Sequence, residues 1–165
     1  MTNWERESDT HIFFWNGVFS NFTHAVIEYK DHIFQNTEQA FMWEKAMYFN
    51  DIEMADKILN TPIPGKAKAL GRKVKNFNDE KWSAVSYLIM INVNLEKYKQ
   101  HYTMREALLS TGSKIIVEAS PYDKIWGIGL HWSDNNVCDE SKWRGQNLLG
   151  KCLVEVRNEL QSVQT

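Results

Sequence analysis

Apolar residues follow one another so closely after Gln39 that they predict a helix with almost no polar face. Phe41, Met42, Trp43 and Ala46 lie within two turns, and such a helix is typical of a buried position. Just upstream, Asn36 and Gln39 have the spacing of a capping box, so the helix is predicted to begin at Asn36 or Thr37.

Three charged residues interrupt this apolar helix, and their spacing separates them. At about 100° per residue, Glu38 and Lys45 fall on nearly one line, whereas Glu44 lies well round the helix and is predicted to face water. Burial raises the pKa of a carboxyl and lowers that of an amine, as a general acid and a nucleophilic lysine require. A structural interpretation stays open, since Glu suits a first helical turn and a Lys side chain can extend past apolar neighbours.

Alternating and helical patterns predict the other elements. Strands are expected at 12–15, 26–30, 33–34 and 115–119, the middle two forming a hairpin. Helices are expected at 51–59, from Pro64, at 80–100, at 104–109 and after Asn147. No linker or repeat interrupts the chain, which predicts one compact domain over residues 1–165.

An aromatic loop follows the first predicted strand. Phe19 and Phe22 flank Asn21, an arrangement that suits a flat base whose edge the amide reads. The alternative is a loop that is anchored in the core by its two rings.

A second loop combines an acid, an aromatic residue and glycines. Asp123 and Trp126 precede Gly127 and Gly129, where the backbone can approach a ligand or a neighbouring segment closely. We interpret this loop as a candidate ligand site. The polar stretch 131–142 after it is predicted to be a mobile insertion.

Basic residues are concentrated in one segment, which contains Lys66, Lys68, Arg72, Lys73 and Lys75. Arg72 is the best placed for a bidentate contact with phosphate, although a solvated helix face explains the charges equally well. Trp82, near the start of the longest predicted helix, belongs either to the core or to the mouth of a pocket.

Composition further limits the classes of function that the chain can have. A net charge of −2 argues against holding long nucleic acid by charge alone, while 7 Trp, 8 Phe and 6 Tyr suit pockets that stack planar ligands. Neither a secretory signal nor a membrane span is predicted. The two cysteines form no disulfide framework, which predicts a reducing cytoplasm, and the five histidines show no metal-ligand spacing, so no metal is expected.

Taken together, these stretches resemble the YbiA-like family, also called the NADAR domain family. The resemblance runs from Phe13 to Leu160. It rests on Phe19-Ser20-Asn21-Phe22, Thr37-Glu38 with Lys45, Gly71-Arg72, Trp82, Asp123 to Gly129, and Asn147-Leu148-Leu149-Gly150.

The resemblance implies a compact, mostly helical α+β domain with a small antiparallel sheet and a core over about residues 12–161. It also implies cleavage of an N-glycosidic bond at ribose C1 without a cofactor. One branch of the family acts on ribosylamino-pyrimidine phosphates of riboflavin synthesis, and another removes ADP-ribose from guanine bases of nucleic acid. The partner is therefore expected to be an ADP-ribose or ribosyl-phosphate substrate, with ADP-ribosylated DNA as a macromolecular form of it.

For the site, the resemblance implies catalytic roles for Glu38, Lys45 and Asp123. The residues expected to bind substrate are Phe19, Asn21, Phe22, Arg72, Trp82, Trp126, Gly127, Gly129 and Asn147. The chain departs from the family pattern at Ile128, at Gln39-Ala40 and in the stretch 131–142, which leaves the substrate branch open. Two other classes also stay open, namely a module that binds ADP-ribose without cleaving it and a structural protein.

Overall fold

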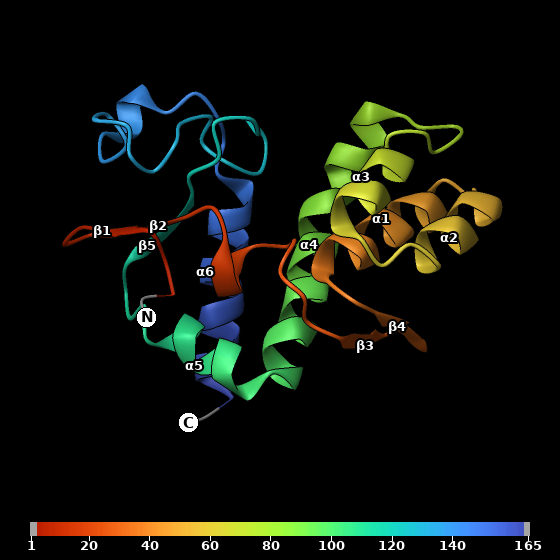
Figure 1. Cartoon of the computed structure of the whole chain (residues 1–165), viewed down its shortest axis with the longest axis horizontal. Coiled ribbons are helices and arrows are strands. Elements are labelled where there is room, and N and C mark those ends of the chain that lie inside the picture. Colours follow the sequence, from red (N-terminus) through yellow and green to blue (C-terminus); the bar gives the residue numbers. More distant parts are fainter. Residues whose placement is uncertain (1–2, 164–165) are drawn as a thin grey trace. The chain divides into compact units, whose positions relative to one another are not determined.

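The computed structural model describes residues 3–163, which form helices and short strands (Figure 1). The helices are α1 (Thr37–Tyr48), α2 (Ile52–Leu59), α3 (Pro64–Gly71), α4 (Asp79–Gln100), α5 (Tyr102–Leu109) and α6 (Leu148–Ser162). The strands are β1 (Arg6–Glu7), β2 (His11–Phe14), β3 (Ile27–Tyr29), β4 (His32–Phe34) and β5 (Ile115–Glu118). Two 3-10 turns, η1 (Gly17–Phe19) and η2 (Glu140–Lys142), complete the set.

These elements confirm the expected α+β class. By their contacts they form two compact units, one of which is Asn21–His101, while the other contains the described residues on either side of that range. The assignment of one domain to residues 1–165 stays a prediction. Between residues 3 and 163, no helix combines the length and apolar character that crossing a bilayer would require.

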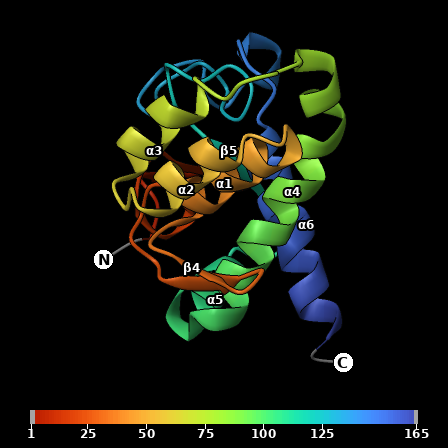
Figure 2. The ribbon, with the colours of Figure 1, turned by 90° about the vertical axis from the view of Figure 1, so that its right-hand side faces the viewer.

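The unit Asn21–His101 is built around α1, which contacts α2, α3 and α4 (Figure 2). The helix begins where the sequence predicts, because Asn36 Oδ1 accepts a hydrogen bond of 2.9 Å from the amide of Gln39. The second half of the capping box is displaced by one residue, since Gln39 Oε1 accepts from the amide of Gln35 and not from that of Asn36. Nearly every side chain from Thr37 to Ala46 is buried, as the apolar pattern indicates.

The hairpin β3–β4 turns through Lys30 and Asp31, both with positive φ (49° and 64°), one residue earlier than predicted. Its outer edge is covered by residues at the end of α4. The side-chain amide of Gln100 accepts a 2.8 Å bond from the Glu28 N–H and donates a 2.8 Å bond to the Glu28 carbonyl. His101 Nε2 lies 2.8 Å from the carbonyl oxygen of Val26 on the same edge.

The other unit contains a three-stranded sheet in the order β1-β2-β5. The strands β1 and β2 are antiparallel, but β2 and β5 run parallel, so this sheet is mixed, whereas the hairpin β3–β4 forms a small antiparallel sheet as expected. The long connection of residues 15–114 between β2 and β5 makes this parallel pairing possible, because a short hairpin could join them only in antiparallel fashion.

Helix α6 packs directly on β5. Asn147, predicted to cap α6, makes no side-chain cap and instead bonds β5 with both ends of its amide. Its Oδ1 accepts from the Glu118 amide at 3.0 Å, and its Nδ2 donates to the Ile116 carbonyl at 2.9 Å. A Cβ on Gly150 would lie 2.0 Å from the Ile116 carbonyl oxygen, so only glycine permits this close packing.

The stretch 131–142 is packed and bonded, contrary to the prediction of a mobile insertion. Val137 is fully buried in a cluster with Phe13 and Val117 of the sheet. The indole of Trp143 donates to the Val137 carbonyl at 2.8 Å, and the Arg6 guanidinium bonds two carbonyl oxygens of the stretch. The polar sequence hides this anchoring because only two of its side chains, Val137 and Trp132, supply contacts with this cluster.

Candidate active site

The start of α1 is held against the chain at Asn21. The amide N–H of Glu38 donates to the Asn21 carbonyl at 3.1 Å, and the Thr37 hydroxyl donates to the Asn21 side-chain oxygen at 3.0 Å. The Asn21 side chain is itself buried and also bonds Asn94 and the sulfur of Met90. Asn21, predicted to read a base, therefore uses its amide to fix the first turn of α1, and with it Glu38.

The carboxyl group of Glu38 belongs to a buried residue, 6% exposed. Lys45, almost two turns further along the same helix, is half-buried, and desolvation is the main cause that lowers the pKa of its amine. The nearby Arg72 guanidinium lowers this pKa further, whereas Glu38 and Asp79 raise it. The effect of the Glu38 charge on the pKa of Lys45 agrees with the placement of both residues on one face of α1.

Glu44 is buried and does not face water, which corrects the helical-wheel prediction. Its carboxylate accepts a 2.5 Å hydrogen bond from the Tyr29 hydroxyl and lies 2.6 Å from Lys30 Nζ. Both partners belong to the hairpin, which covers the side of α1 that the wheel left open. Glu44 is therefore a structural carboxylate, while Glu38 is the acid on the face of Lys45.

The basic segment contributes Arg72, which is exposed and follows the last residue of α3. One face of Phe22 lies 5.7 Å from Lys68 Nζ, and this ring is 44% exposed. The ring of Phe22 is thus accessible to an aromatic base. The cations of Lys68 and Arg72 are accessible to phosphate. Gly71 permits the close approach of α3 to α1, because a Cβ there would meet the Met42 sulfur at 2.1 Å.

Two predicted aromatic ligands are core residues. Trp82 is 8% exposed and contacts Phe41, Tyr48 and Phe49 at centroid distances between 5.2 and 6.3 Å. In the other unit, Phe19 is fully buried and packs edge-on against Phe14 at 5.6 Å. For Phe19 the structure favours the alternative interpretation, a loop anchored by its ring. Trp82 supports α1 from the start of α4.

The loop with Asp123 and Trp126 is rigidly connected to the chain before α6. Asp123 Oδ1 accepts hydrogen bonds from the amides of Ile125 and Trp126 at 2.9 and 2.8 Å. The Gly127 carbonyl accepts from the Asn147 amide at 3.1 Å. Asp123 and Trp126 are both partly exposed on this loop, whose shape is set by backbone bonds.

The two glycines of this loop serve contacts within the protein. Gly127 is buried, and a Cβ there would lie 3.0 Å from the carbonyl oxygens of Asp123 and Glu118. Gly129 has a φ of +69° and lies against Arg144. Of the two possibilities that the sequence leaves open, the structure shows close approach to neighbouring segments.

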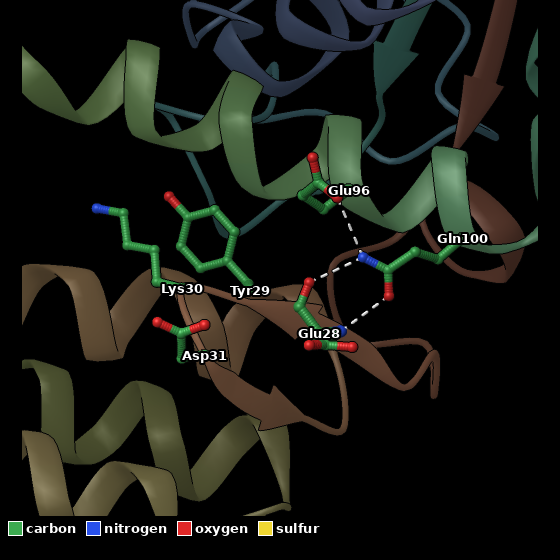
Figure 3. A pocket seen from close by; sticks show the side chains of 6 residues that line it. All are labelled: Glu28, Tyr29, Lys30, Asp31, Glu96 and Gln100. Atoms are coloured by element: carbon green, nitrogen blue, oxygen red, sulfur yellow. Dashed lines mark hydrogen bonds between the residues drawn. The ribbon is translucent and has the colours of Figure 1, made fainter.

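A hollow of about 620 Å³ in the unit Asn21–His101 contains none of the predicted site residues (Figure 3). Its walls are formed by Glu28, Tyr29, Lys30, Asp31, Glu96 and Gln100, from the hairpin and the end of α4. The figure shows the Gln100 amide bonded to the backbone of Glu28 and to the Glu96 carboxylate, so polar groups within the hollow already partner one another. We do not assign the active site to it.

Sequence reasoning missed Lys97, which is fully buried in α4. Desolvation lowers the pKa of this lysine to about 7. A signal was present, because Lys97 lies one helical turn after the buried Val93 and therefore on the apolar face. It also missed Phe77, whose ring lies under the amine of Lys45.

The match to a family model decides the relationship of the chain to known proteins. The model of the NADAR domain matches residues 3–161. The chain belongs to the NADAR domain family. The resemblance read from the sequence motifs is thereby confirmed, and all predicted site residues lie inside the matched range.

Individual relatives agree with this family. The chain is 36% identical over 170 residues to N-glycosidase R617 of Acanthamoeba polyphaga mimivirus, covering 94% of this chain and 99% of that protein. It is 43% identical over 129 residues to Protein irg-1 of Caenorhabditis elegans, covering 77% of this chain and 61% of that longer protein. The NMR structure of the E. coli protein YbiA matches 96% of this chain and 89% of that chain, with a TM-score of 0.79 at 27% identity.

Proposed function

We propose that this protein is an N-glycosidase that hydrolyses the bond between ribose C1 and an ADP-ribosylated guanine base in nucleic acid. Membership of the NADAR family, with relatives named N-glycosidases, supports the class of bond. The observation that carries the proposal is the pairing on α1 of a buried carboxyl, Glu38, with the amine of Lys45, whose pKa is lowered by burial.

These two residues supply the chemistry of C–N cleavage. The neutral amine of Lys45 attacks C1 while the bond to guanine breaks, and Glu38 donates a proton to the departing base. The sugar ring then opens to a Schiff base between C1 and Lys45, with the ring oxygen taking up the proton that the lysine nitrogen loses. Water adds to C1, the lysine departs, and Glu38 is reprotonated for the next turnover.

Asp123 lies in the other unit, and the role proposed for it, stabilising positive charge at C1 or binding ribose hydroxyls, rests on the family resemblance alone. The two amide bonds to its Oδ1 keep the carboxylate in one orientation, which suits a group that acts by position. Trp126, partly exposed on the same loop, is proposed to stack an aromatic base of the substrate.

Binding of an ADP-ribosyl group, with two phosphates, is supported by the charges of the unit Asn21–His101. Arg72 is exposed beside Lys45, and Lys68 lies one helical turn before it, next to the accessible ring of Phe22. Two cations with an adjacent aromatic face suit a diphosphate attached to a base better than a single phosphate.

A second candidate is the hydrolysis of ribosylamino-pyrimidine phosphates. It is favoured by a 26% identity over 146 residues to Riboflavin biosynthesis protein VVA0006 of Vibrio vulnificus, which covers 88% of this chain and 36% of that protein. The same Glu38 and Lys45 would serve, because the bond cleaved is again a ribosyl C–N bond. Only the groups attached to the ribose differ.

The test is incubation of the purified protein with guanine-ADP-ribosylated DNA and, separately, with the ribosylamino-pyrimidine phosphate. Mass spectrometry identifies the products. Release of ADP-ribose with unmodified guanine supports the proposal, whereas release of ribose phosphate alone supports the second candidate. Saturable binding of ADP-ribose without any product would instead indicate a non-catalytic module.

Two glutamate variants control this experiment. Glu38→Gln is expected to reduce turnover by about a hundredfold or more, because it removes a proton donor. Glu44→Gln changes a carboxyl that is equally buried on the same helix but bonded to Tyr29, and it is expected to keep turnover within a few-fold. Equal losses in both variants would contradict the role given to Glu38.

A further inference from the structure

An aromatic ring outside the motifs of the resemblance lies directly against the amine of Lys45. Phe77 belongs to the connection between α3 and α4, immediately before Asn78, which caps α4. Asn76 has a φ of +59°, so the chain turns sharply just before the ring. Phe77 packs edge-on against the buried Phe49, with centroids 5.4 Å apart, and yet remains 45% exposed.

The contact with the amine is close. Lys45 Nζ lies 4.4 Å from the centroid of the Phe77 ring, well within the range of a cation–π interaction. Because the Phe77 ring is nearly half exposed, it buries little apolar surface in this position. Its contacts with Phe49 and Lys45 are therefore what hold it there. Lys45 lies in α1, and Phe49 directly follows the last residue of that helix.

The charged groups around Lys45 shift the pKa of its amine in both directions. Arg72, after α3, disfavours the ammonium form, whereas Glu38 in α1 and Asp79 in α4 favour it. The face of an aromatic ring carries partial negative charge and adds to the side that favours the ammonium. Unlike the carboxylates, the ring also defines a place for Nζ, because the attraction is strongest over the ring centre.

We propose that Phe77 is a positioning residue for Lys45, and that its ring holds the amine in the place from which it attacks the sugar. The ring also stabilises the protonated amine of the free enzyme and so sets the pH at which Lys45 becomes a nucleophile. This inference rests on the proposed function, because it assigns Phe77 to the reaction that Lys45 performs.

The first test compares pH profiles of kcat/KM for two variants. Phe77→Leu keeps an apolar contact with Phe49 but lacks a ring face, so the acid limb is expected to move to lower pH by about half a unit. Its plateau is expected to fall about three- to tenfold, because the amine is no longer held in place. Phe77→Tyr keeps the ring and is expected to show the acid limb and the plateau of the wild type.

A purely structural role makes a different prediction. If Phe77 only shields Phe49, Phe77→Leu lowers the thermal midpoint but leaves the acid limb where it is. The acid limbs of Phe77→Leu and Phe77→Tyr then coincide. An unmoved limb in a folded Phe77→Leu protein overturns the proposal. Near-ultraviolet circular dichroism of both variants establishes that they are folded.

The second test needs no substrate. Competitive acetylation of the whole protein between pH 6 and pH 11, read by peptide mass spectrometry, gives the titration of each lysine. Lys57, whose pKa is raised by Glu53, serves as the internal reference. A lower midpoint for Lys45 in Phe77→Leu, with Lys57 unchanged, supports the inference even if neither substrate is cleaved, and an unchanged Lys45 midpoint overturns it even if turnover is observed.

Discussion

The carboxylate of Glu44 accepts a 2.5 Å hydrogen bond from the Tyr29 hydroxyl and pairs with Lys30 at 2.6 Å, although Glu44 itself is only 6% exposed. A carboxylate buried to this degree is stable only with such partners, since an isolated one would carry a large desolvation cost. The three residues therefore attach the hairpin to α1 at a position about 100° round the helix from Lys45.

The Tyr29 hydroxyl links stability to pH. Burial, and then the hydrogen bond to Glu44, raise the pKa of Tyr29 above its ordinary value of 10.0. A group with a raised folded-state pKa contributes stability that is present below its unfolded pKa and is lost as pH rises above it. We expect the free energy of unfolding to fall by about 1.4 kcal/mol per pH unit from this group above pH ~10, as urea titrations would measure.

Two phenylalanine variants isolate this effect. Tyr29→Phe is expected to cost about 1 to 2 kcal/mol at pH 7, because Glu44 loses a donor, and to show a flatter decline above pH ~10. Tyr122→Phe, at a side chain 84% exposed, is expected to behave as wild type at every pH. A Tyr29→Phe protein with the wild-type alkaline decline would contradict the assignment.

For individual residues, sequence spacing predicted faces but not neighbours. The line through Glu38 and Lys45 was correctly placed because both lie on one helix, where 3.6 residues per turn fixes the geometry. The position of Glu44 was wrong because the hairpin that covers it precedes α1 and packs by tertiary contacts. For Phe19 and Trp82 the sequence left a core position and a place at the site both open, because nothing local distinguishes a stacking ring from a core ring.

The side chain that caps α1 has two partners. Asn36 bonds the Gln39 amide through Oδ1 and donates from Nδ2 to the Pro62 carbonyl at 2.8 Å, so one side chain both caps α1 and ties it to the chain before α3. Asn36→Ala is expected to destabilise the protein by about 2 kcal/mol or more by urea unfolding. It is also expected to lower turnover, since Glu38 lies in the first turn.

The matched change is Asn78→Ala at the cap of α4. Asn78 is exposed and its Oδ1 accepts the equivalent bond from the Lys81 amide at 2.9 Å, while among residues 3–163 its amide nitrogen donates to no second partner. The expected cost is about 1 kcal/mol, with turnover largely retained. If the two variants lost equal stability and equal turnover, the special dependence of the site on the Asn36 cap would be disproved.

The packing of α6 on β5 gives a second element-scale prediction. Gly150→Ala places a methyl group 2.0 Å from the Ile116 carbonyl oxygen and beside the Asn147 amide, so α6 must move away from the sheet. We expect a loss of about 3 kcal/mol or more in the free energy of unfolding.

Gly65→Ala is the control, because a Cβ at this position in α3 meets nothing within 4 Å. It is expected to leave stability unchanged or raise it by up to about 1 kcal/mol, as alanine favours helices over glycine. Similar denaturation midpoints for Gly150→Ala and wild type would show that the helix tolerates a shift.

Among the elements, those fixed by local signals were predicted well. Asn36, Asn78 and Pro64 start their helices as the capping and first-turn preferences indicate. The parallel pairing of β2 with β5 was missed, because it joins segments about a hundred residues apart and no local pattern encodes it. Asn147 was given a helix-capping role by its position, whereas its amide replaces ladder bonds beside β5.

At the scale of the whole molecule, the salt dependence of kcat/KM distinguishes a nucleic-acid substrate from a small one. A net charge of −2 gives no general attraction to nucleic acid, so any strand must be bound by local cations such as those of α3. Raising salt from about 50 to 200 mM is expected to lower kcat/KM about tenfold on an ADP-ribosylated oligonucleotide and much less on ADP-ribosyl-guanosine.

Charge variants on the basic segment check this prediction. Lys66→Gln and Lys73→Gln alter exposed lysines and are each expected to flatten the logarithmic salt slope by about 1 on the oligonucleotide only. The same slope for both substrates in the wild type would show that α3 does not bind a strand. At this scale the family was predictable from the order of the motifs, whereas the substrate was not, because the ligand contacts depend on how separate stretches pack.

The side chain of Gln100 has a consequence for solubility. A strand at the border of a sheet presents free N–H and C=O groups that another chain can extend, and this is a common beginning of aggregation. The Gln100 amide occupies both groups of Glu28, in the way a neighbouring peptide would. A glutamate at this position, as deamidation would create, could no longer donate to the Glu28 carbonyl. The chemical ageing of one side chain far from Lys45 would then expose the border of the hairpin, and the first sign would be turbidity in concentrated solutions while turnover is still normal.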